Sequence, residues 1–138
     1  MSLIFDSYAI ITLFREEPGY EEVIDWLGKI NREQLGYMSV INLGEVYYIT
    51  SRKQSPQKAA VALEAAMQLP FTFVDADFDL TYRAAKLKAS YKLSYADAFA
   101  AALTIEKKGL LITGDLEFKN LVKEKDFKVH FIRRKPKG

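Results

Sequence analysis

Five short apolar runs alternate along the chain with longer segments whose apolar residues recur every three or four positions. The runs span residues 3–5, 35–38, 71–74, 110–113 and 128–132. Their length favours buried β-strands, whereas the spacing between them favours amphipathic helices. We expect six helices, over residues 8–14, 23–31, 43–50, 56–67, 80–91 and from 94 up to the glycine at 109.

Proline and glycine mark several of these boundaries. Pro18 and Gly19 follow the first helix, Pro56 fits the first turn of the fourth, and Gly109 closes the sixth. The apolar stripe that we expect to face the core in the fourth helix comprises Ala60, Leu63 and Met67.

Strands that alternate with helices indicate a parallel sheet with right-handed crossovers and helices on both faces. The 138 residues suffice for one compact domain and are too few for two. We therefore predict a single α/β domain over residues 1–138, with a five-stranded parallel sheet. Residues 133–138 are basic, and we expect them to form a flexible tail.

Composition narrows the class of protein. The absence of cysteine excludes disulfides, zinc–thiolate sites and thiol nucleophiles, and is compatible with a reducing cytoplasm. The first residues are apolar but include Asp6 and lack basic residues, so we expect neither a signal peptide nor a membrane span, and a cytoplasmic location. The net charge of +2 is weakly basic, which permits a polyanionic substrate without requiring one.

Four acidic residues lie where an expected strand ends or an expected helix begins: Asp6, Glu45, Asp97 and Asp115. In open α/β sheets the carboxyl ends of the strands and the amino ends of the helices meet at one edge, where ligands bind. The four side chains can therefore share one pocket. Crowded carboxylates repel one another unless a cation balances them, and Mg²⁺ prefers oxygen ligands of this kind.

Helix capping is the alternative for each acid taken singly. Asp6 and Asp115 can be N-caps, and the pairs Asn42–Glu45 and Ser94–Asp97 have the spacing of a capping box. The joint pattern favours a metal site for phosphodiester chemistry, because all four caps would lie along the same sheet edge.

Other sites fit the sequence less well. Asp75, Asp77 and Asp79 imitate the start of an EF-hand loop, but the later glycine and glutamate of that loop are missing, so we interpret them as a loop with a helix cap. A phospho-acceptor receiver domain needs a lysine after the fourth strand and leaves Asp97 unexplained. The lone histidine, His130, lies in an expected strand, where a structural role is the more common one.

The chain resembles the PIN-domain nucleases, and within them the toxin subunits of VapBC-type toxin–antitoxin pairs. The resemblance covers nearly all 138 residues. It rests on Asp6-Ser7, the Glu17-Pro18-Gly19 break, Asn42-Leu43-Gly44-Glu45, the run Tyr95-Ala96-Asp97-Ala98-Phe99-Ala100-Ala101-Ala102, and Thr113-Gly114-Asp115 with Phe118. The alanine-rich block around Asp97 is the most specific of these motifs. Two positions depart from the family pattern: Tyr8 stands where many members have Asn, and Glu117 where some have Asp.

The resemblance implies a five-stranded parallel sheet between helices, a homodimer, and a Mg²⁺ or Mn²⁺ site formed by Asp6, Glu45, Asp97 and Asp115. It implies an endoribonuclease in which Asp6 and Asp97 hold a metal that activates water, and Glu45 and Asp115 orient that water or help to hold a second metal. Ser94 and Thr113 are expected to support these ligands through their hydroxyls, although Ser94 equally fits a simple helix cap.

The implied partners are RNA and an antitoxin protein. We expect the antitoxin to inhibit by inserting a basic side chain, most simply an arginine, into the acidic pocket. Two other hypotheses remain open at this point: a non-catalytic PIN-like RNA-binding module, and a PIN nuclease of RNA maturation that has no antitoxin.

Overall fold

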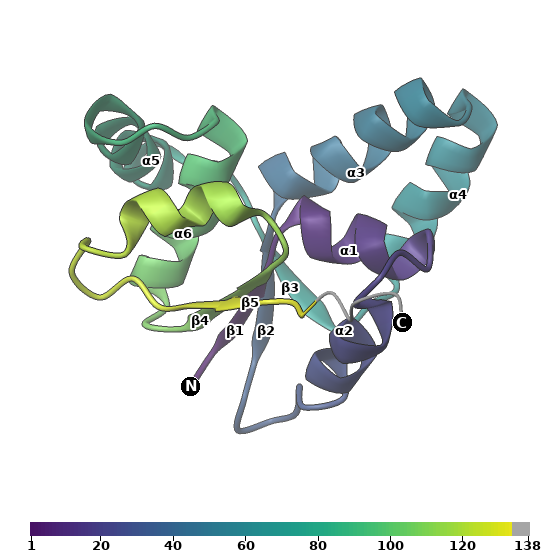
Figure 1. Ribbon diagram of the computed structural model, residues 1–138, viewed down its shortest axis with the longest axis horizontal. Helices are drawn as coiled ribbons and strands as arrows, with labels where there is room; N and C mark the ends of the chain where they lie inside the picture. The colour runs from purple at the N-terminus through teal and green to yellow at the C-terminus, as the bar shows by residue number, and fades with distance from the viewer. Residues whose placement is uncertain (134–138) are drawn as a thin grey trace.

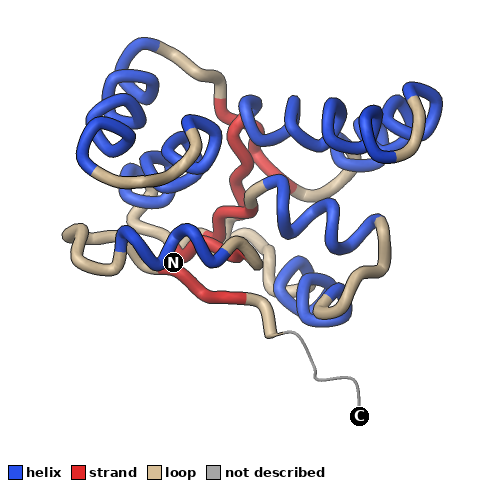
Figure 2. Tube along the Cα trace, turned by 45° about the horizontal axis from the view of Figure 1, so that its top comes forward, coloured by secondary structure: helices blue, strands red, loops and turns tan. Residues whose placement is uncertain are grey.

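Five parallel strands form one sheet at the centre of the computed structural model, which describes residues 1–133 (Figure 1, Figure 2). The strands lie in the order β3-β2-β1-β4-β5. Their bounds are β1 (Leu3–Phe5), β2 (Gly36–Ser39), β3 (Phe71–Val74), β4 (Leu110–Thr113) and β5 (Val129–Phe131). All neighbouring pairs run parallel, so the predicted α/β fold is confirmed.

Helices cover both faces of the sheet. Their bounds are α1 (Ser7–Phe14), α2 (Tyr20–Leu27), α3 (Val40–Lys53), α4 (Pro56–Met67), α5 (Phe78–Ser90), α6 (Tyr95–Glu106) and the 3-10 helix η1 (Leu116–Leu121). Figure 1 shows α5 and α6 on one side of the strands and α1 to α4 on the other.

The central strand, β1, explains why the first apolar run is uninterrupted. Leu3 pairs with Gly36 of β2 on one edge and with Leu110 of β4 on the other. All three residues of β1 are fully buried. A strand with neighbours on both edges and helices on both faces offers no exposed side-chain position. The chain leaves this buried strand directly at Asp6.

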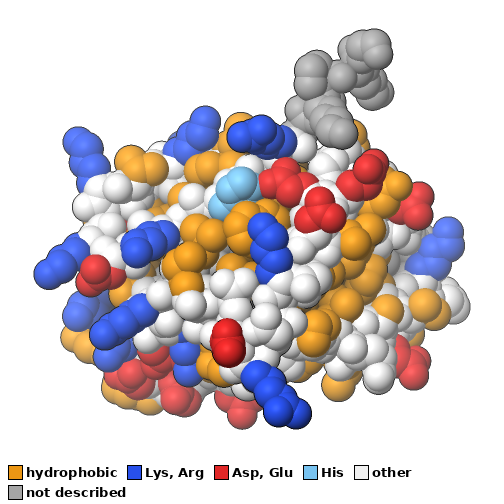
Figure 3. All heavy atoms as spheres, turned by 90° about the horizontal axis from the view of Figure 1, so that it is seen from below, with side chains coloured by type: hydrophobic (Ala, Val, Ile, Leu, Met, Phe, Trp, Pro, Cys, Tyr) orange, Lys and Arg blue, Asp and Glu red, His pale blue; other side chains and the backbone are white. Residues whose placement is uncertain are grey.

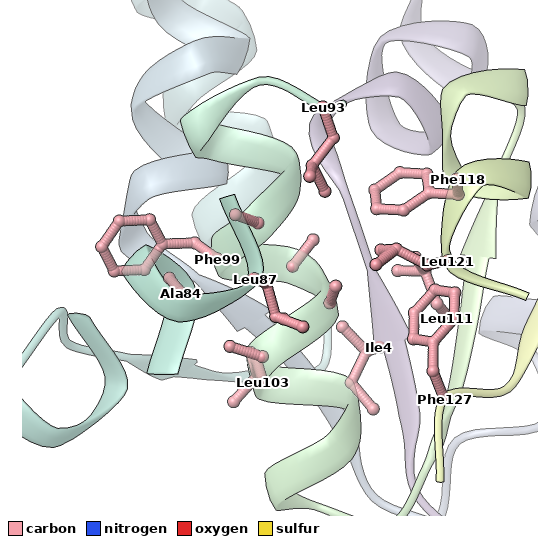
Figure 4. Close-up of a cluster of buried hydrophobic side chains, with 14 of the residues drawn as sticks. Ile4, Ala84, Leu87, Leu93, Phe99, Leu103, Leu111, Phe118, Leu121 and Phe127 are labelled. Carbon is pink, nitrogen blue, oxygen red and sulfur yellow. The ribbon is translucent and has the colours of Figure 1, made fainter. Parts of the chain in front are cut away.

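Alternate side chains of β1 enter two separate hydrophobic cores, because successive residues of a strand face opposite ways. Ile4 packs beneath α5, α6 and η1 with Leu103 and Phe118 (Figure 4). Phe5 packs on the other face with Met38. Full burial of one such side chain contributes about 1.5–3 kcal/mol.

The second helix ends earlier than predicted. α2 stops at Leu27, whereas the apolar spacing suggested Asn31. The side-chain Oδ1 of Asn31 accepts hydrogen bonds from the amides of Glu33, at 2.8 Å, and Gln34, at 2.9 Å. An asparagine that bonds to the backbone ahead of it closes a turn instead of continuing a helix.

The predicted core face of the fourth helix is wrong by one position. Ala59 and Ala66 are buried in α4, whereas Ala60 and Met67 are exposed. α4 packs closely against α3, and the distance between packed helices depends on the side chains at their contact. Small size, more than hydrophobicity, therefore selects the buried face.

Gly109 follows the sixth helix as predicted, but for a different reason. The left-handed residue at this helix end is Lys108, with a φ of 50°. A Cβ on Gly109 would lie 2.4 Å from Cδ1 of Ile4 and 2.6 Å from the carbonyl oxygen of Ser2. The glycine therefore permits a close approach of the turn between α6 and β4 to the start of β1.

His130 joins the edge strand β5 to α2, on the face seen in Figure 3. Its Nε2 contacts the carboxylate of Glu22, and its ring packs against Trp26 with the ring centroids 5.1 Å apart. The amide of Arg133 donates to the same carboxylate at 2.8 Å. Burial raises the pKa of Glu22, but the hydrogen bonds from Arg133, His130 and Trp26 outweigh it and lower the pKa below its ordinary value. The histidine thus makes a structural contact.

Within residues 1–133, none of the helices has the length and apolar content that a bilayer crossing requires. Apart from Arg133, the basic tail expected at residues 133–138 lies outside the described residues.

Candidate active site

Two of the predicted site residues lie just after strands and cap the helices that come next. Asp6 follows β1, and its Oδ1 accepts a hydrogen bond from the amide of Ala9 at 2.9 Å at the start of α1. Asp115 follows β4, and its Oδ1 accepts from the amide of Glu117 at 2.9 Å at the start of η1. Asp6 and Asp115 therefore both cap a helix and belong to the candidate site.

The other two acids lie within helices, Asp97 in the first turn of α6 and Glu45 in the second turn of α3. Asp97 is in α6, where the amide of Asp97 donates to Oγ of the N-cap Ser94 at 3.1 Å. Glu45 is in α3, whose N-cap is Ser39. The predicted capping box of Asn42 and Glu45 is therefore wrong, since the helix has already begun when the chain reaches Asn42.

The four carboxyl groups form one electrostatic cluster. Burial is the main cause that raises the pKa of Asp6 to about 7, and the nearby charges of Asp115 and Glu45 raise it further, although two hydrogen bonds oppose the shift. Burial likewise raises the pKa of Asp97 to about 9. A hydrogen bond to Asp115 and its charge add to that shift, as do the charges of Asp6 and Glu45. The structure thus brings together all four acids that the sequence singled out.

This cluster opens into a pocket of about 310 Å³ between α1, α3 and α6. Glu45, Asp97 and Asp115 line the pocket. Asp6 lies beneath them, with 1% of its surface exposed. The pocket wall therefore includes three of the four acids, whereas Asp6 is shielded from solvent.

Thr113 supports two of the acids at once. Its hydroxyl donates to Oδ2 of Asp6, and the same Oγ1 accepts from the amide of Asp115 at 3.0 Å. The fully buried threonine therefore couples the end of β1 to the end of β4. Ser94, by contrast, bonds to the backbone amide of Asp97 and not to its carboxylate, which is the role of a helix cap.

Two residues that were not predicted as supporting residues hold Glu45. Ser7 Oγ donates to Oε1 of Glu45 at 2.8 Å, and Asn42 Nδ2 donates to the same atom at 3.0 Å. Asn42 Nδ2 also reaches the carbonyl oxygen of Ala96 at 3.2 Å, which ties α3 to α6. The adjacency of Ser7 to Asp6 and the three-residue spacing of Asn42 and Glu45 were the only sequence signals of these contacts.

The two departures from the family pattern both lie at this pocket. Tyr8 lines it, and a Cβ on Gly114 would lie 2.3 Å from the Tyr8 ring, so the ring rests against the glycine between Thr113 and Asp115. Glu117 also lines the pocket, and its Oε1 accepts from the amide of Ser94 at 2.9 Å. Glu117 thus connects η1 to the start of α6.

The donor set fits a hard divalent cation. It consists of carboxylate oxygens, which such cations prefer. The pKa values of Asp6 and Asp97 are raised, so the four carboxyl groups can all be ionised near neutral pH only if a cation lies between them. As the side chains of residues 1–133 stand, no three carboxylate or imidazole groups are arranged to hold one metal ion. Asp97 and Asp115 are hydrogen-bonded to each other, so metal binding requires this one contact to open, whereas the bonds from Ser7, Asn42 and Thr113 can stay in place.

Comparison with known families agrees with the geometry. The family model of the PIN domain matches residues 3–124, a segment that contains all four acids. The chain belongs to the PIN domain family. A search of curated protein sequences gives no match.

Solved structures share this PIN fold at low sequence identity. VapBC2 from Rickettsia felis, bound to a DNA fragment from its promoter, contains a chain that is 16% identical, with a TM-score of 0.73 over 96% of this chain and 100% of that one. A toxin–antitoxin complex from Klebsiella pneumoniae gives 22% identity and a TM-score of 0.66 over 96% and 99%. VapC20 from Mycobacterium tuberculosis, a sarcin–ricin loop cleaving toxin, gives 15% identity and a TM-score of 0.70 over 85% and 92%.

Proposed function

We propose that this PIN domain is a Mg²⁺- or Mn²⁺-dependent endoribonuclease and the toxin of a VapBC-type toxin–antitoxin pair, acting in the cytoplasm. The observation that carries the proposal is the convergence of Asp6, Glu45, Asp97 and Asp115 on one pocket of the sheet edge. The similarity of the fold to chains from toxin–antitoxin complexes and to an RNA-cleaving toxin supports the biological setting.

Each acid has a distinct task in this proposal. Asp6 and Asp97 would hold a cation, which supplies an activated water and neutralises charge on the attacked phosphate. Glu45, fixed by Ser7, and Asp115 would orient that water or help to hold a second cation. Thr113 keeps the two oxygens of Asp6 in a fixed orientation through its hydroxyl.

A basic side chain is available at the rim for the substrate. Lys53, at the end of α3, lines the acidic pocket. A lysine in this place contacts a phosphate of the RNA backbone and positions the strand without reading its sequence.

The first prediction concerns the acids themselves. Asp6→Asn and Asp97→Asn each should abolish Mg²⁺-dependent cleavage of RNA and leave the melting temperature equal or higher, because each removes a charge from a crowded cluster and keeps the side-chain shape. Cleavage is measured by mapping the ends produced in total cellular RNA with and without Mg²⁺. Asp25→Asn, an exposed acid of α2, is the matched control and should cut at the parental rate. Parental cleavage by both site variants would overturn the proposal.

An antitoxin partner fits a second feature of the same surface. An apolar groove of about 430 Å³ runs between α1, α3 and α4. Ile11 lines both this groove and the acidic pocket. A partner segment that is seated in the groove therefore reaches the acids, where an arginine can pair with a carboxylate.

We also propose that the PIN domain forms a homodimer.

A further inference from the structure

One side of α3 continues the acidic pocket from Glu45 toward the end of the helix. Glu45, Ile49 and Lys53 recur every four residues, and all three line the pocket. The helix rises about 12 Å between the first and the last of them, which is several times the ~3.4 Å rise of one nucleotide in a stacked strand. The α3 wall of the pocket is therefore long enough for more than one nucleotide beyond the acids.

Tyr48 and Arg52 border this wall. Tyr48 comes three residues after Glu45, and side chains at that spacing are neighbours on a helix surface. Arg52 likewise comes three residues after Ile49. Cζ of Arg52 lies 5.4 Å from the centroid of the Tyr48 ring, and the tyrosine is 44% exposed. An exposed ring beside a guanidinium group is a surface on which single-stranded nucleobases stack.

The charge around this pair has one sign. Between Glu45 and Glu64 the sequence contains no acid and three bases, Arg52, Lys53 and Lys58. A phosphate backbone is attracted to such a stretch, whereas a second copy of the same stretch is repelled by it. RNA is therefore the better occupant.

A similar pair on α5 fits RNA less well. Lys86 Nζ lies 5.1 Å from the centroid of the Tyr82 ring. That helix begins beside three acids, Asp75, Asp77 and Asp79, which repel phosphates. In the described structure α5 also contributes no side chain to the acidic pocket. Position and charge thus both favour the pair on α3.

We propose that Tyr48 stacks on a nucleobase of the RNA beside the cleaved phosphate, while Arg52 and Lys53 contact neighbouring phosphates. The inference rests on the proposed nuclease function, because the four acids define where the cleaved phosphate lies. A base that stacks on a side chain has left the stack of a duplex, so the RNA is unpaired at this nucleotide.

The antitoxin proposed above leaves this side of α3 open. Its apolar groove includes Thr50, which is two residues and therefore about 200° around the helix from Tyr48. A partner seated in that groove blocks RNA at the acids and not at the tyrosine ring.

Binding is measured separately from cleavage, in the full chain with Asp97→Asn, which keeps the probe intact. The first probe is a fluorescent single-stranded oligoadenosine of about twelve nucleotides, a length within the range of single-strand binding sites. The second is a strand of the same length and charge from which every base is missing. Fluorescence anisotropy with Mg²⁺ present gives the dissociation constant of each.

Tyr48→Ala should raise the dissociation constant for oligoadenosine about 5- to 100-fold and leave that for the abasic strand unchanged, because stacking acts on the base alone. Tyr48→Phe keeps the ring and should restore most of the lost affinity. The matched control is Tyr47→Ala, which removes a tyrosine that is 38% exposed about 100° away on the same helix and should change neither constant.

Lys53→Ala tests the phosphate contact. It should weaken both probes by the same factor and lower the slope of the logarithm of affinity against the logarithm of salt concentration by about 1. A loss confined to oligoadenosine would show that Lys53 does not act through phosphates and would overturn that part of the inference.

The contrary results separate the inference from the nuclease. An unchanged dissociation constant in Tyr48→Ala overturns the stacking contact, and so does an equal loss for both probes. RNA cleavage is assayed in parallel with all four acids intact. A chain that cuts RNA with the same KM after Tyr48→Ala keeps the nuclease and loses the contact, whereas one that binds oligoadenosine through Tyr48 but never cuts RNA overturns the nuclease alone. If Tyr48→Ala spares RNA and dissociates a dimer in sedimentation velocity, the ring serves a second copy and the inference is wrong.

Discussion

Asn42 shows how a single buried side chain can connect the fold to the site. It is fully buried on α3, and its amide group donates to both Glu45 and the backbone of α6. Its Oδ1 has no hydrogen-bond partner among the described residues. A buried polar group that is only partly satisfied is costly, and the cost is tolerable where the other half of the group holds a functional side chain in place.

The second prediction follows from this contact. Asn42→Ala should weaken Mn²⁺ binding by about 10- to 100-fold, because Glu45 loses one of its two side-chain donors and is held less firmly. Isothermal titration calorimetry measures the affinity. The matched control is Asn120→Ala, whose amide donates to the carbonyl oxygen of Lys92 outside the pocket. If the two variants bind Mn²⁺ equally well, Asn42 does not position Glu45.

The sequence could identify the acids but not the residues that hold them. Asp6, Asp97 and Asp115 were recognisable because strand ends and helix starts can be read from apolar periodicity. The hydrogen bond from Ser7 to Glu45 spans 38 residues, and no local pattern encodes it. Asn42 was misinterpreted because its spacing to Glu45 is the same in a capping box and within a helix that has already begun.

At the scale of elements, the surroundings of two glycines predict opposite effects of a glycine-to-alanine substitution on the free energy of unfolding. A Cβ on Gly109 meets Ile4 and the backbone of Ser2 at less than 3 Å. A Cβ on Gly44, within α3, meets nothing within 4 Å. Gly109 is therefore required by packing, whereas Gly44 is a helical position where glycine is only less favourable than alanine.

The third prediction is that Gly109→Ala lowers the free energy of unfolding by about 1–3 kcal/mol, because the backbone of Ser2 cannot move aside. Gly44→Ala should raise it by about 0.5–1 kcal/mol through helix propensity. Urea denaturation monitored by circular dichroism measures both. Equal effects of the two substitutions would show that the close approach at Gly109 is not limiting.

The bounds of an element were predicted correctly where burial on both faces makes every position of a strand apolar. β1, β3 and β4 coincide with the expected runs, because a central strand is apolar at every position and β3 is bounded by clear turn residues. The inward face of α4 was missed, because alanine at 59, 60, 62, 65 and 66 makes several faces look alike. Which of these faces is buried depends on how closely α4 packs against α3, and that distance cannot be read from a single sequence.

At the scale of the whole molecule, parallel topology explains how acids 109 positions apart come together. β1 and β4 are neighbours in the sheet although their order in the chain is first and fourth. Their carboxyl ends therefore place Asp6 and Asp115 at the same edge, and the first two turns of α3 and the first turn of α6 supply Glu45 and Asp97. This general rule of α/β sheets made the cluster predictable before any contact was known.

The fourth prediction links this cluster to the stability of the metal-free protein. The ordinary pKa of an aspartate is 3.8, whereas folding raises that of Asp6 to about 7 and that of Asp97 to about 9. While the pH lies between the ordinary and the raised pKa values, the native state binds more protons than the unfolded state, so the free energy of unfolding falls as the pH rises from about 4 to about 9. In the variant Asp6→Asn with Asp97→Asn this fall should be shallower.

The same cluster predicts how added metal changes the melting temperature at different pH values. Mg²⁺ or Mn²⁺ binds the ionised cluster, so added metal should raise the melting temperature more at pH 8 than at pH 5, and more with Mn²⁺. Differential scanning fluorimetry with chelator-treated controls measures the shift. The variant in which all four acids are changed to the corresponding amides should show no shift. An equal shift there would place the metal elsewhere, for example at Asp75, Asp77 and Asp79.

The last prediction concerns inhibition by the antitoxin. The free cluster attracts a guanidinium group, whose planar fork can pair with a carboxylate at two points. An antitoxin arginine inserted into the pocket therefore both blocks RNA and competes with metal. Changing that arginine to alanine should weaken inhibition, and rising Mg²⁺ should lower the measured affinity of the parental complex. The affinity of Asp6→Asn with Asp97→Asn should depend less on Mg²⁺, with Asp25→Asn as the control. A complex in which the partner binds a remote face and leaves the acids open to solvent would contradict this mode of inhibition.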